Sequence, residues 1–584
     1  YLGFDFRYDA PEGGPGLEPS CRLIDEEGRG PSLILGAGGR LKLVDMAGEV
    51  RDLAPLAPGN WYHLAMTVRG DAARITLTDI RDVRVSIYKV EPKAGKSPQT
   101  FDAVALELPK AITQLQFISS APDEATGSWM LDNVCMAGNV DAPRAACWPF
   151  EQKPIRKLRK SPKKVIGYYY PIYTNAYNDQ DPGLSWYTRS VTNPNSVNKR
   201  KGDRRDAGSE LLYRPLPRPP MPSGLTKEAV RLKAMEEEIR LARQQGMDVL
   251  LVDFWADPHP TNGQRYFGLY SFALLDAARR IDPEFKILPA VYTSKDLTPE
   301  AYADSEYVKR IAAHPAALRL PDGRLAWSMW RTESQSVDWW RKVMARMKAN
   351  GTPIALVGQF NSWDKLKDFS EICYGMVHWG RRTPGTDFPW VKTTRPLTEK
   401  VGFPICMQDV RTRGRWAQDS RNSETLRWLW TQAIEDDADW AFIYTVTDYS
   451  EQAMAPSTRI GFVPYDLNAY YIQWFKTGKQ PEIVRDRLYY IHRPHHSGVE
   501  QLKGKPWNYG RTGPSDQIEL LAFLTEPGTL KIKIADETFQ KEATAGITSF
   551  MVPLPKDVAF VPEFSLEREG RVIASGKSQY PVMD

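Results

Sequence analysis

The chain has 584 residues, of which 42% are hydrophobic, and typical domain sizes divide such a length into roughly two to four domains. Its 77 Lys and Arg residues nearly balance 72 Asp and Glu residues, and the net charge of +5 comes without a concentrated basic tract, which argues against a nucleic-acid partner. No stretch reaches the apolar length of a membrane span, and five cysteines without CxxC spacing or a Cys/His cluster argue against a metal site.

The first residues, YLGFDFRYDA, lack the charged and then apolar form of a signal peptide. Either the protein is intracellular or a leader has been removed, and we expect the second. The expected location is therefore secreted, periplasmic or cell-surface.

Residues 1–150 alternate short apolar segments with turns about every ten residues, which predicts an antiparallel β-sandwich. The segment APGNWYHLAMTVRG, followed much later by GSWMLDNVCMAG, resembles the laminin G or concanavalin-like jelly roll. In that family Trp61 and His63 would lie in a core strand. Such domains bind glycans in some proteins and only support a neighbouring domain in others, and both roles remain open here.

A basic, proline-containing stretch at residues 151–164 predicts a solvated linker. From residue 165 to 480, strand-like and helix-like segments alternate, and roughly eight such units predict a (β/α)8 barrel with a parallel sheet. A doubly wound sheet is the alternative, but no Gly-rich phosphate loop follows the first strand. A polar insertion at residues 174–224 would either shape a cleft or be disordered, and residues 486–584 predict a second small β-sandwich.

In a barrel of this kind, functional side chains stand where strands end. Acids, amides and aromatic residues follow the predicted strands and indicate a sugar-binding lining, without a Ser-His-Asp or metal-ligand pattern. We expect no metal and no cofactor. The residues predicted to line the substrate site are Tyr168, Tyr169, Asp253, Trp255, His259, Trp330, Arg331, Gln359, His378, Trp379, Gln408, Asp448 and Tyr449.

Glycoside hydrolysis commonly uses one protonated carboxyl, which assists the leaving oxygen, and one ionised carboxyl, which activates water or attacks carbon. The second and eighth strands flank the first strand of a closed barrel, so each can supply one carboxyl. We choose Asp257 and Glu451 as the catalytic pair. Asp253 and Asp448 lie closer to their strands and could instead be buried supports, and the choice between Asp253 and Asp257 as the base stays open.

Residues 165–584 resemble glycoside hydrolase family 71, the α-1,3-glucanases. The resemblance rests on motif order: EEIRLARQQGMDVLLVDFWAD, YVKRIAAHPAALRLPDGRLAWSMW, ETLRWLWTQAIEDDADWAFIYTVTDYSEQ and LNAYYIQWFKTGKQPEIVRDRLYYIHRPH, with TAGITSFMVPLP in the C-terminal sandwich. The family run Thr-Trp-Asn-Asp-Tyr-Gly-Glu-Ser is Thr-Val-Thr-Asp-Tyr-Ser-Glu-Gln here. Asp448, Tyr449 and Glu451 match it, whereas Val446, Thr447, Ser450 and Gln452 do not.

The resemblance implies an inverting hydrolase of α-1,3-glucan, with Glu451 as general acid and Asp257 as the base that activates water. Asp253 stands where the family has Asn, and the departures around Asp448 make a related α-linked polysaccharide an alternative substrate. An endo-α-mannanase-like enzyme and an inactive glycan-binding protein are the other two interpretations. A polysaccharide or oligosaccharide is the expected partner in all of them, and the sequence does not predict the oligomeric state.

Overall fold

The computed structural model describes the strands of residues 2–136, then residues 148–171, two short strands at 197–198 and 202–203, and most of 225–583. Within the last range, the undescribed residues are 257–261, 295, 381–382, 412–414, 450, 458–459, 500–506 and 511–512. The chain forms two compact units. One comprises Tyr1–Cys147 with Pro219–Leu225, and the other comprises Trp148–Arg218 with Thr226–Asp584.

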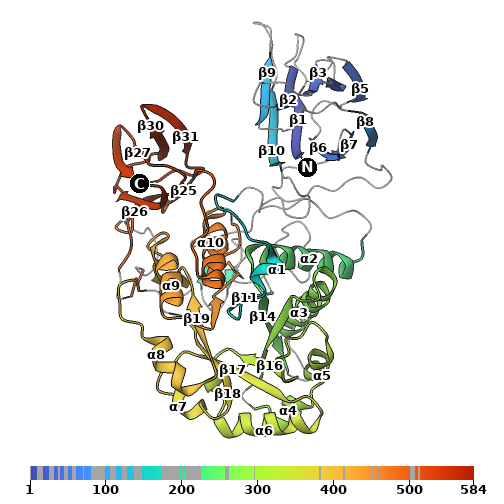
Figure 1. The fold of residues 1–584 in the computed structure, drawn as a ribbon, viewed down its shortest axis with the longest axis vertical. Coiled ribbons are helices and arrows are strands. Elements are labelled where there is room, and N and C mark those ends of the chain that lie inside the picture. Colours follow the sequence, from blue (N-terminus) through green and yellow to red (C-terminus); the bar gives the residue numbers. More distant parts are fainter. Residues whose placement is uncertain are drawn as a thin grey trace. The chain divides into compact units, whose positions relative to one another are not determined.

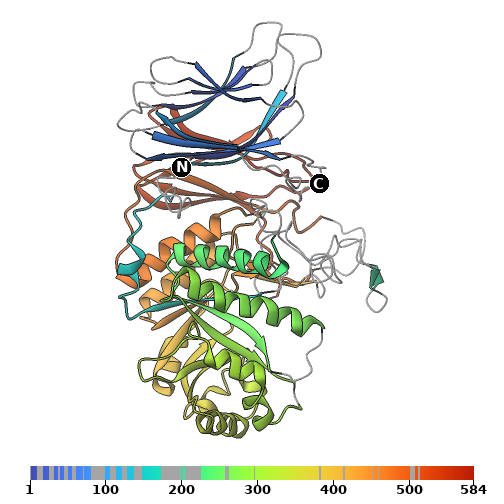
Figure 2. The same ribbon diagram turned by 90° about the vertical axis from the view of Figure 1, so that its right-hand side faces the viewer.

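The first unit contains two five-stranded antiparallel sheets, with strand orders β10-β1-β6-β7-β8 and β5-β4-β3-β2-β9 (Figures 1 and 2). This arrangement agrees with the antiparallel β-sandwich predicted for the region. The strands are β1 (Leu2–Asp9), β2 (Glu18–Ile24), β3 (Ser32–Gly36), β4 (Arg40–Val44), β5 (Val50–Pro55), β6 (Trp61–Arg69), β7 (Ala72–Ile80), β8 (Gln99–Ala105), β9 (Gln114–Ser120) and β10 (Ser128–Met136).

A closed barrel of parallel strands forms the centre of the second unit, with the order β11-β14-β15-β16-β17-β18-β19-β22. Strand β22 pairs in parallel with both β19 and β11, which closes the barrel and excludes the doubly wound alternative. The strands are β11 (Lys164–Tyr169), β14 (Val249–Trp255), β15 (Lys286–Tyr292), β16 (Leu325–Met329), β17 (Ile354–Phe360), β18 (Cys373–His378), β19 (Lys400–Ile405) and β22 (Trp440–Ile443).

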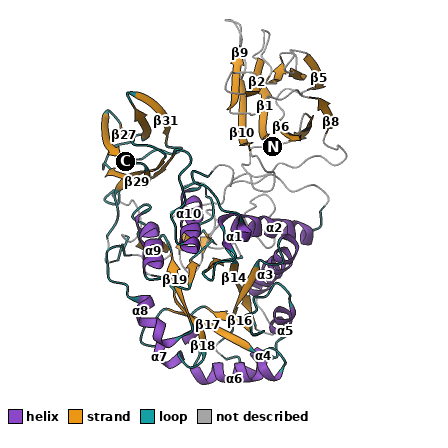
Figure 3. Cartoon of the chain, in the orientation of Figure 1, coloured by secondary structure: helices purple, strands orange, loops and turns teal. Residues whose placement is uncertain are grey.

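Helices surround this barrel (Figure 3). The first long helix shows why they form where they do: Thr226 caps its start by accepting a hydrogen bond from Ala229 N, and Gly246 ends it in the left-handed region at φ 94°. The α-helices are α2 (Lys227–Gln245), α3 (Asn262–Ile281), α4 (Pro299–Ala303), α5 (Glu306–Ala313), α6 (Val337–Ala349), α7 (Leu366–Phe369), α8 (Trp390–Thr394), α9 (Glu424–Glu435) and α10 (Val463–Thr477), and the 3-10 helices are η5 (Thr332–Ser334) and η6 (Arg395–Leu397). In the described part of the chain, no helix is both long and apolar enough to cross a membrane.

The stretch predicted as a linker is partly packed against the barrel. It contains helix α1 (Ile155–Leu158), whose Leu158 is buried. Arg159 donates hydrogen bonds to Asp282 and Glu284 at the start of β15. A basic run therefore contributes ion pairs here instead of remaining solvated. The insertion at 174–224 lies outside the described residues apart from β12 (Val197–Asn198) and β13 (Gly202–Asp203).

The C-terminal strands form the second predicted sandwich, with sheets in the orders β25-β26-β29 and β28-β27-β30-β31. One apolar core joins the two sheets: Leu520 from β26 packs in the same cluster as Leu530 from β27 and Leu566 from β30. The strands are β25 (Arg487–Ile491), β26 (Gln517–Leu524), β27 (Gly528–Ile534), β28 (Glu537–Ala543), β29 (Gly546–Pro553), β30 (Glu563–Arg568) and β31 (Arg571–Lys577).

Candidate active site at the barrel mouth

Three neighbouring strands bring a carboxyl and two phenols together at the carboxyl end of the barrel. The Tyr168 hydroxyl of β11 donates a hydrogen bond to Asp253 Oδ1 of β14 at 2.8 Å. It also lies 2.7 Å from the Tyr292 hydroxyl of β15. Parallel pairing sets Tyr168 beside Leu251 and Asp253 beside Ala290, so from β11 to β14 to β15 each of the three side chains lies two residues beyond the partner of the one before.

Asp253 is only 2% exposed, and its surroundings favour the neutral acid. Burial raises its pKa to about 8, a shift that the hydrogen bonds of Tyr168 and Tyr292 reduce and the charge of Asp448 increases. Burial and then the charge of Asp253 raise the pKa of both tyrosines well above its usual value. At neutral pH all three groups therefore hold their protons.

The last barrel strand leads to a second group of carboxyls. Strand β23 (Thr447–Asp448) pairs with β24 (Gln452–Ala453), and Glu451 lies in the turn between them. Asp448 is 9% exposed, whereas the Glu451 side chain is 33% exposed. The hairpin thus places one carboxyl inward and one toward solvent.

Arg411 links this hairpin to the loop after β19. Strand β20 (Asp409–Arg411) pairs with β21 (Trp416–Gln418). The Arg411 guanidinium lies 3.1 Å from Asp409 Oδ1 and 3.7 Å from Glu451 Oε2. Burial lowers the pKa of Arg411, but the hydrogen bond to Asp409 and the charges of Asp409, Glu451 and Asp448 raise it overall. Arg411 is therefore a cation shared by Asp409, Asp448 and Glu451.

Aromatic rings pack around Tyr168 and Tyr292. Trp379, after β18, packs edge-on against Tyr168 at a centroid distance of 5.6 Å and lies tilted against Tyr444 at 4.7 Å. Trp330, after β16, contacts Trp379 at 5.5 Å, and Trp255 stacks on Tyr292 at 5.3 Å. In the described part of the chain, the indole Nε1 atoms of Trp330 and Trp379 are buried without a hydrogen-bond partner. The rings of Trp330 and Trp379 are themselves partly exposed and offer flat faces, which suit a sugar.

Gln359 acts inside the barrel as a support. It is fully buried, donates from Nε2 to Ser328 Oγ at 3.0 Å, and accepts from the Tyr444 hydroxyl at 3.1 Å. Its amide therefore fixes the ring against which Trp379 packs.

Not all of the predicted lining residues are brought together. The Tyr169 hydroxyl points away from the barrel interior, 3.9 Å from Met235 Sδ of α2. The His378 ring packs among Trp363, Phe388 and Trp390, and its Nδ1 accepts from Gly380 N at 3.0 Å. Both side chains belong to the layer between strands and helices.

The remaining predicted residues divide by exposure. Gln408 and Tyr449 are buried at the strand ends. Arg331 is exposed, has a left-handed backbone with φ 53°, and lies 5.7 Å from the Trp330 ring. Asp257 and His259 lie outside the described residues, so the role predicted for each stays a prediction. Among described residues, no group of three or more His, Cys, Asp or Glu side chains could hold a metal ion.

Sequence reasoning missed Arg411 and Tyr444. Arg411 follows Asp409 by two residues, after a predicted strand. An arginine so close to an acid at a strand end could have indicated Arg411 as a site residue. Tyr444 ends the apolar run of β22 and resembled a core residue.

Comparisons with known proteins give remote similarities only. No family model and no curated protein matches the chain. Among solved structures, the GH99 endo-alpha-mannosidase from Bacteroides thetaiotaomicron is 16% identical, with 54% of this chain and 97% of that chain covered and a TM-score of 0.42. A glycosyl hydrolase family 2 member from Bacteroides cellulosilyticus is 11% identical, with 97% and 58% covered and a TM-score of 0.35. A beta-glycosidase from Bacteroides vulgatus is 8% identical, with 99% and 64% covered and a TM-score of 0.32.

These neighbours are glycosidases by description, but similarity at this level carries no argument about activity. The resemblance to glycoside hydrolase family 71 stays a prediction.

Proposed function

We propose that the protein is a glycoside hydrolase that cleaves an α-linked polysaccharide, with α-1,3-glucan as the first candidate. One observation carries the proposal: Glu451, on the hairpin that follows the last barrel strand, is 33% exposed and has two neighbours of opposite charge, the buried Asp448 of the same hairpin and Arg411 at 3.7 Å. A carboxyl that reaches solvent and whose protonation is set by charged neighbours suits the general acid of glycoside hydrolysis. The indole rings of Trp330 and Trp379, which follow β16 and β18, offer a stacking surface for a sugar.

In the proposed mechanism, Glu451 is the general acid that protonates the leaving oxygen. Its partial exposure lets it reach a substrate. A negative charge on the adjacent, buried Asp448 disfavours a second negative charge on Glu451 and so favours its protonated form. Arg411 acts in the opposite sense, because a cation favours the carboxylate. The proton on Glu451 therefore depends on the balance between these two neighbours.

Asp257 is the proposed base that activates water for attack on the opposite face of the sugar. Asp253 is poorly suited to that role, since a carboxyl whose pKa is raised to about 8 holds its proton at neutral pH. Asp257 follows Asp253 by four residues in the sequence. The proposed stereochemical outcome is inversion, for which the two carboxyls should lie about 6.5–9.5 Å apart.

The test is release of reducing ends from a panel containing α-1,3-glucan, α-mannan and a β-linked glucan. We expect cleavage of an α-linked polymer, with the anomeric configuration of the first product, followed by NMR, opposite to that of the bond cut. Cleavage of α-mannan in preference to α-1,3-glucan would replace the substrate but keep the mechanism. Tight binding without any release would support a glycan-binding protein and overturn the proposal.

A polymeric substrate also fits the expected location outside the cytoplasm, which we retain as part of the proposal. Fractionation of the native host, with detection of the protein by antibody, tests it. Recovery only with cytoplasmic markers would contradict it.

A further inference from the structure

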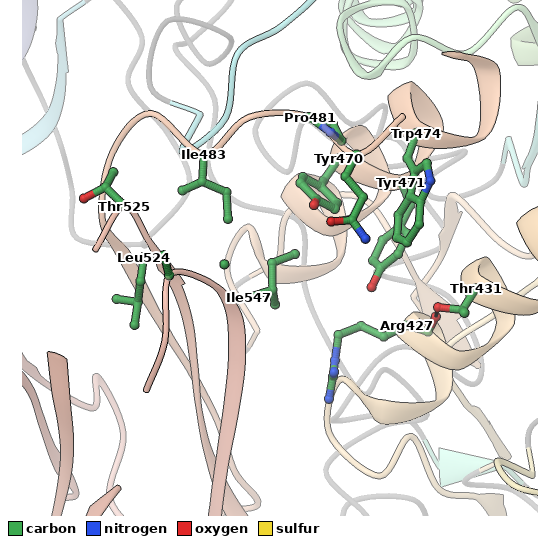
Figure 4. A pocket seen from close by; sticks show the side chains of 13 residues that line it. Arg427, Thr431, Tyr470, Tyr471, Trp474, Pro481, Ile483, Leu524, Thr525 and Ile547 are labelled. Atoms are coloured by element: carbon green, nitrogen blue, oxygen red, sulfur yellow. Dashed lines mark hydrogen bonds between the residues drawn. The ribbon is translucent and has the colours of Figure 1, made fainter. Parts of the chain in front are cut away.

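A second site-like feature lies away from the barrel mouth. A pocket of about 510 Å³ opens between helices α9 and α10 on one side and the edge of the C-terminal sandwich on the other (Figure 4). The helices contribute Arg427, Thr431, Tyr470, Tyr471 and Trp474, and the sandwich contributes Leu524, Thr525 and Ile547. None of the barrel-mouth residues described above lines it. Pockets of this size at the junction of two structural parts are typical of ligand sites.

The helix side of the pocket is a rigid aromatic wall. Trp474 stacks on Tyr471 with ring centroids 5.8 Å apart and planes 19° apart. Tyr471 stacks in turn on Trp430 at 6.2 Å and 5°. Trp430 is fully buried and donates from Nε1 to Asn468 Oδ1 at 2.8 Å, which anchors the stack. The half-buried Trp474 is thus held in place before any ligand arrives.

The lining of the pocket carries little unbalanced charge. Arg427 is the one lining residue with a full charge at neutral pH. Its Nε donates to Ser423 Oγ at 2.9 Å, and its Nη2 lies 3.8 Å from the buried carboxylate of Glu519. The charge of Arg427 is therefore matched within the protein, which disfavours an anionic ligand. The hydroxyls of Thr431 and Thr525 already donate to Arg427 O and Asp486 Oδ1, so they can only accept from a ligand, whereas the exposed amide of Gln480 can both donate and accept.

We propose that this pocket is a secondary saccharide-binding site for a short stretch of neutral glycan, separate from the barrel mouth. Flat rings beside uncharged hydrogen-bonding groups fit a sugar, which has an apolar C–H face and a rim of hydroxyls. That the ligand is the enzyme's own polysaccharide rests on the proposed function. A site there would keep a long polymer attached while another part of it enters the mouth.

A peptide is the competing occupant, because β29 is the edge strand of its sheet and contributes Ile547 to the pocket. An added strand needs free carbonyl groups along that edge. Lys541 Nζ already donates to the carbonyl of Ser549 on β29 at 2.9 Å. The edge beside the pocket is therefore partly occupied, which favours the sugar.

The experiment measures binding of neutral hexasaccharides from α-1,3-glucan, α-mannan and cellulose to the full chain by titration calorimetry. Glu451→Gln serves as the background so that hydrolysis does not obscure binding. Loss of the stacking ring in Trp474→Ala should weaken binding roughly tenfold, whereas Trp474→Phe should stay within about threefold. The matched control is Trp339→Ala, which removes a half-buried tryptophan from α6. It should leave affinity unchanged.

A second variant guards against misfolding of Trp474→Ala. Ala545 is an exposed lining residue, so Ala545→Trp should fill the pocket with little effect on thermal unfolding, and it should weaken the same binding. The same two changes are then made in protein that keeps Glu451. Trp474→Ala and Ala545→Trp should each raise KM for the polymer, but they should leave kcat unchanged on substrates short enough to occupy only the barrel mouth.

The outcomes separate this site from the proposed function. Glycan binding that neither Trp474→Ala nor Ala545→Trp alters, or peptide binding in place of glycan binding, overturns the secondary site even if cleavage is found. Binding that depends on Trp474 without cleavage of any glycan supports the secondary site and overturns the hydrolase proposal.

Discussion

Asp253 and Glu451 are two carboxyls of one barrel mouth in contrasting environments. Asp253 is 2% exposed and faces neutral hydroxyl groups, so burial dominates and keeps its proton on. Glu451 is 33% exposed, lies on a hairpin turn and has Arg411 at 3.7 Å. The difference arises from position, because Asp253 lies within strand β14, whereas Glu451 lies in a turn beyond the last barrel strand.

The contrast shows that a perturbed pKa and access to substrate are separate requirements. Asp253 meets the first, because it holds a proton near neutral pH, but it is enclosed by Tyr168 and Tyr292. Glu451 meets the second. We therefore assign the chemistry to Glu451 and regard Asp253 as a neutral hydrogen-bonding support for the mouth.

The largest expected effect comes from removing the proposed catalytic carboxyls. Glu451→Gln and Asp257→Asn should each lower kcat by at least roughly 10³-fold, because each removes a proton-transfer group while keeping side-chain size. Reducing-end assays and circular dichroism measure activity and fold. Glu435→Gln, at an exposed position on α9, is the matched control and should have no effect. Near-normal activity in both catalytic variants would remove the basis of the assignment.

The next largest effect is expected from removing Arg411, the cation beside Glu451. Arg411→Gln should reduce kcat/KM by about 10- to 100-fold and move the alkaline limb of the pH–rate profile to higher pH, because Glu451, the proposed general acid, loses the charge that favours its ionised form. Arg421→Gln removes another partly exposed arginine, paired with Glu424, and is the control. A lower rate with an unshifted profile would mean that Arg411 only holds the loop in place.

The fold was predictable because its signals are long and repeated. Alternation of strand and helix periods predicted the barrel, and closely spaced turns predicted both sandwiches. The site was harder for a physical reason. Strands of a parallel barrel are buried on both faces, so the sequence does not reveal which alternate residues face inward. Tyr168 and Tyr169 are both buried in β11, yet only Tyr168 meets Asp253.

Arg411 shows a second limit of sequence reasoning. Its contact with Glu451 joins residues 40 positions apart through two separate short hairpins, β20–β21 and β23–β24. No local pattern encodes such a meeting, which depends on barrel closure between β19 and β22.

A smaller effect distinguishes support from catalysis at Asp253. An amide resembles a protonated carboxyl in size and hydrogen bonding, so Asp253→Asn should lose less than about tenfold in kcat/KM. Asp253→Ala removes the partner of both tyrosines and should lose more. Steady-state kinetics on the same substrate compares the two variants. A loss in Asp253→Asn as large as in Asp257→Asn would make Asp253 the base and reverse the comparison.

The last effect is on stability and tests the protonation of Asp253 directly. Because the pKa of Asp253 rises from 3.8 to about 8 on folding, the folded state keeps a proton that the unfolded state releases between those values. The free energy of unfolding should therefore fall by up to about 1.4 kcal/mol per pH unit through that window from this group alone. Asp253→Asn has no proton to release, so its Tm should decline less than that of the wild type between about pH 5 and about pH 7.5. The exposed Asp338→Asn on α6 should keep the wild-type pH dependence. Parallel Tm curves for wild type and Asp253→Asn would show that Asp253 does not keep its proton on folding, and Asp253 could then not be a neutral hydrogen-bonding support.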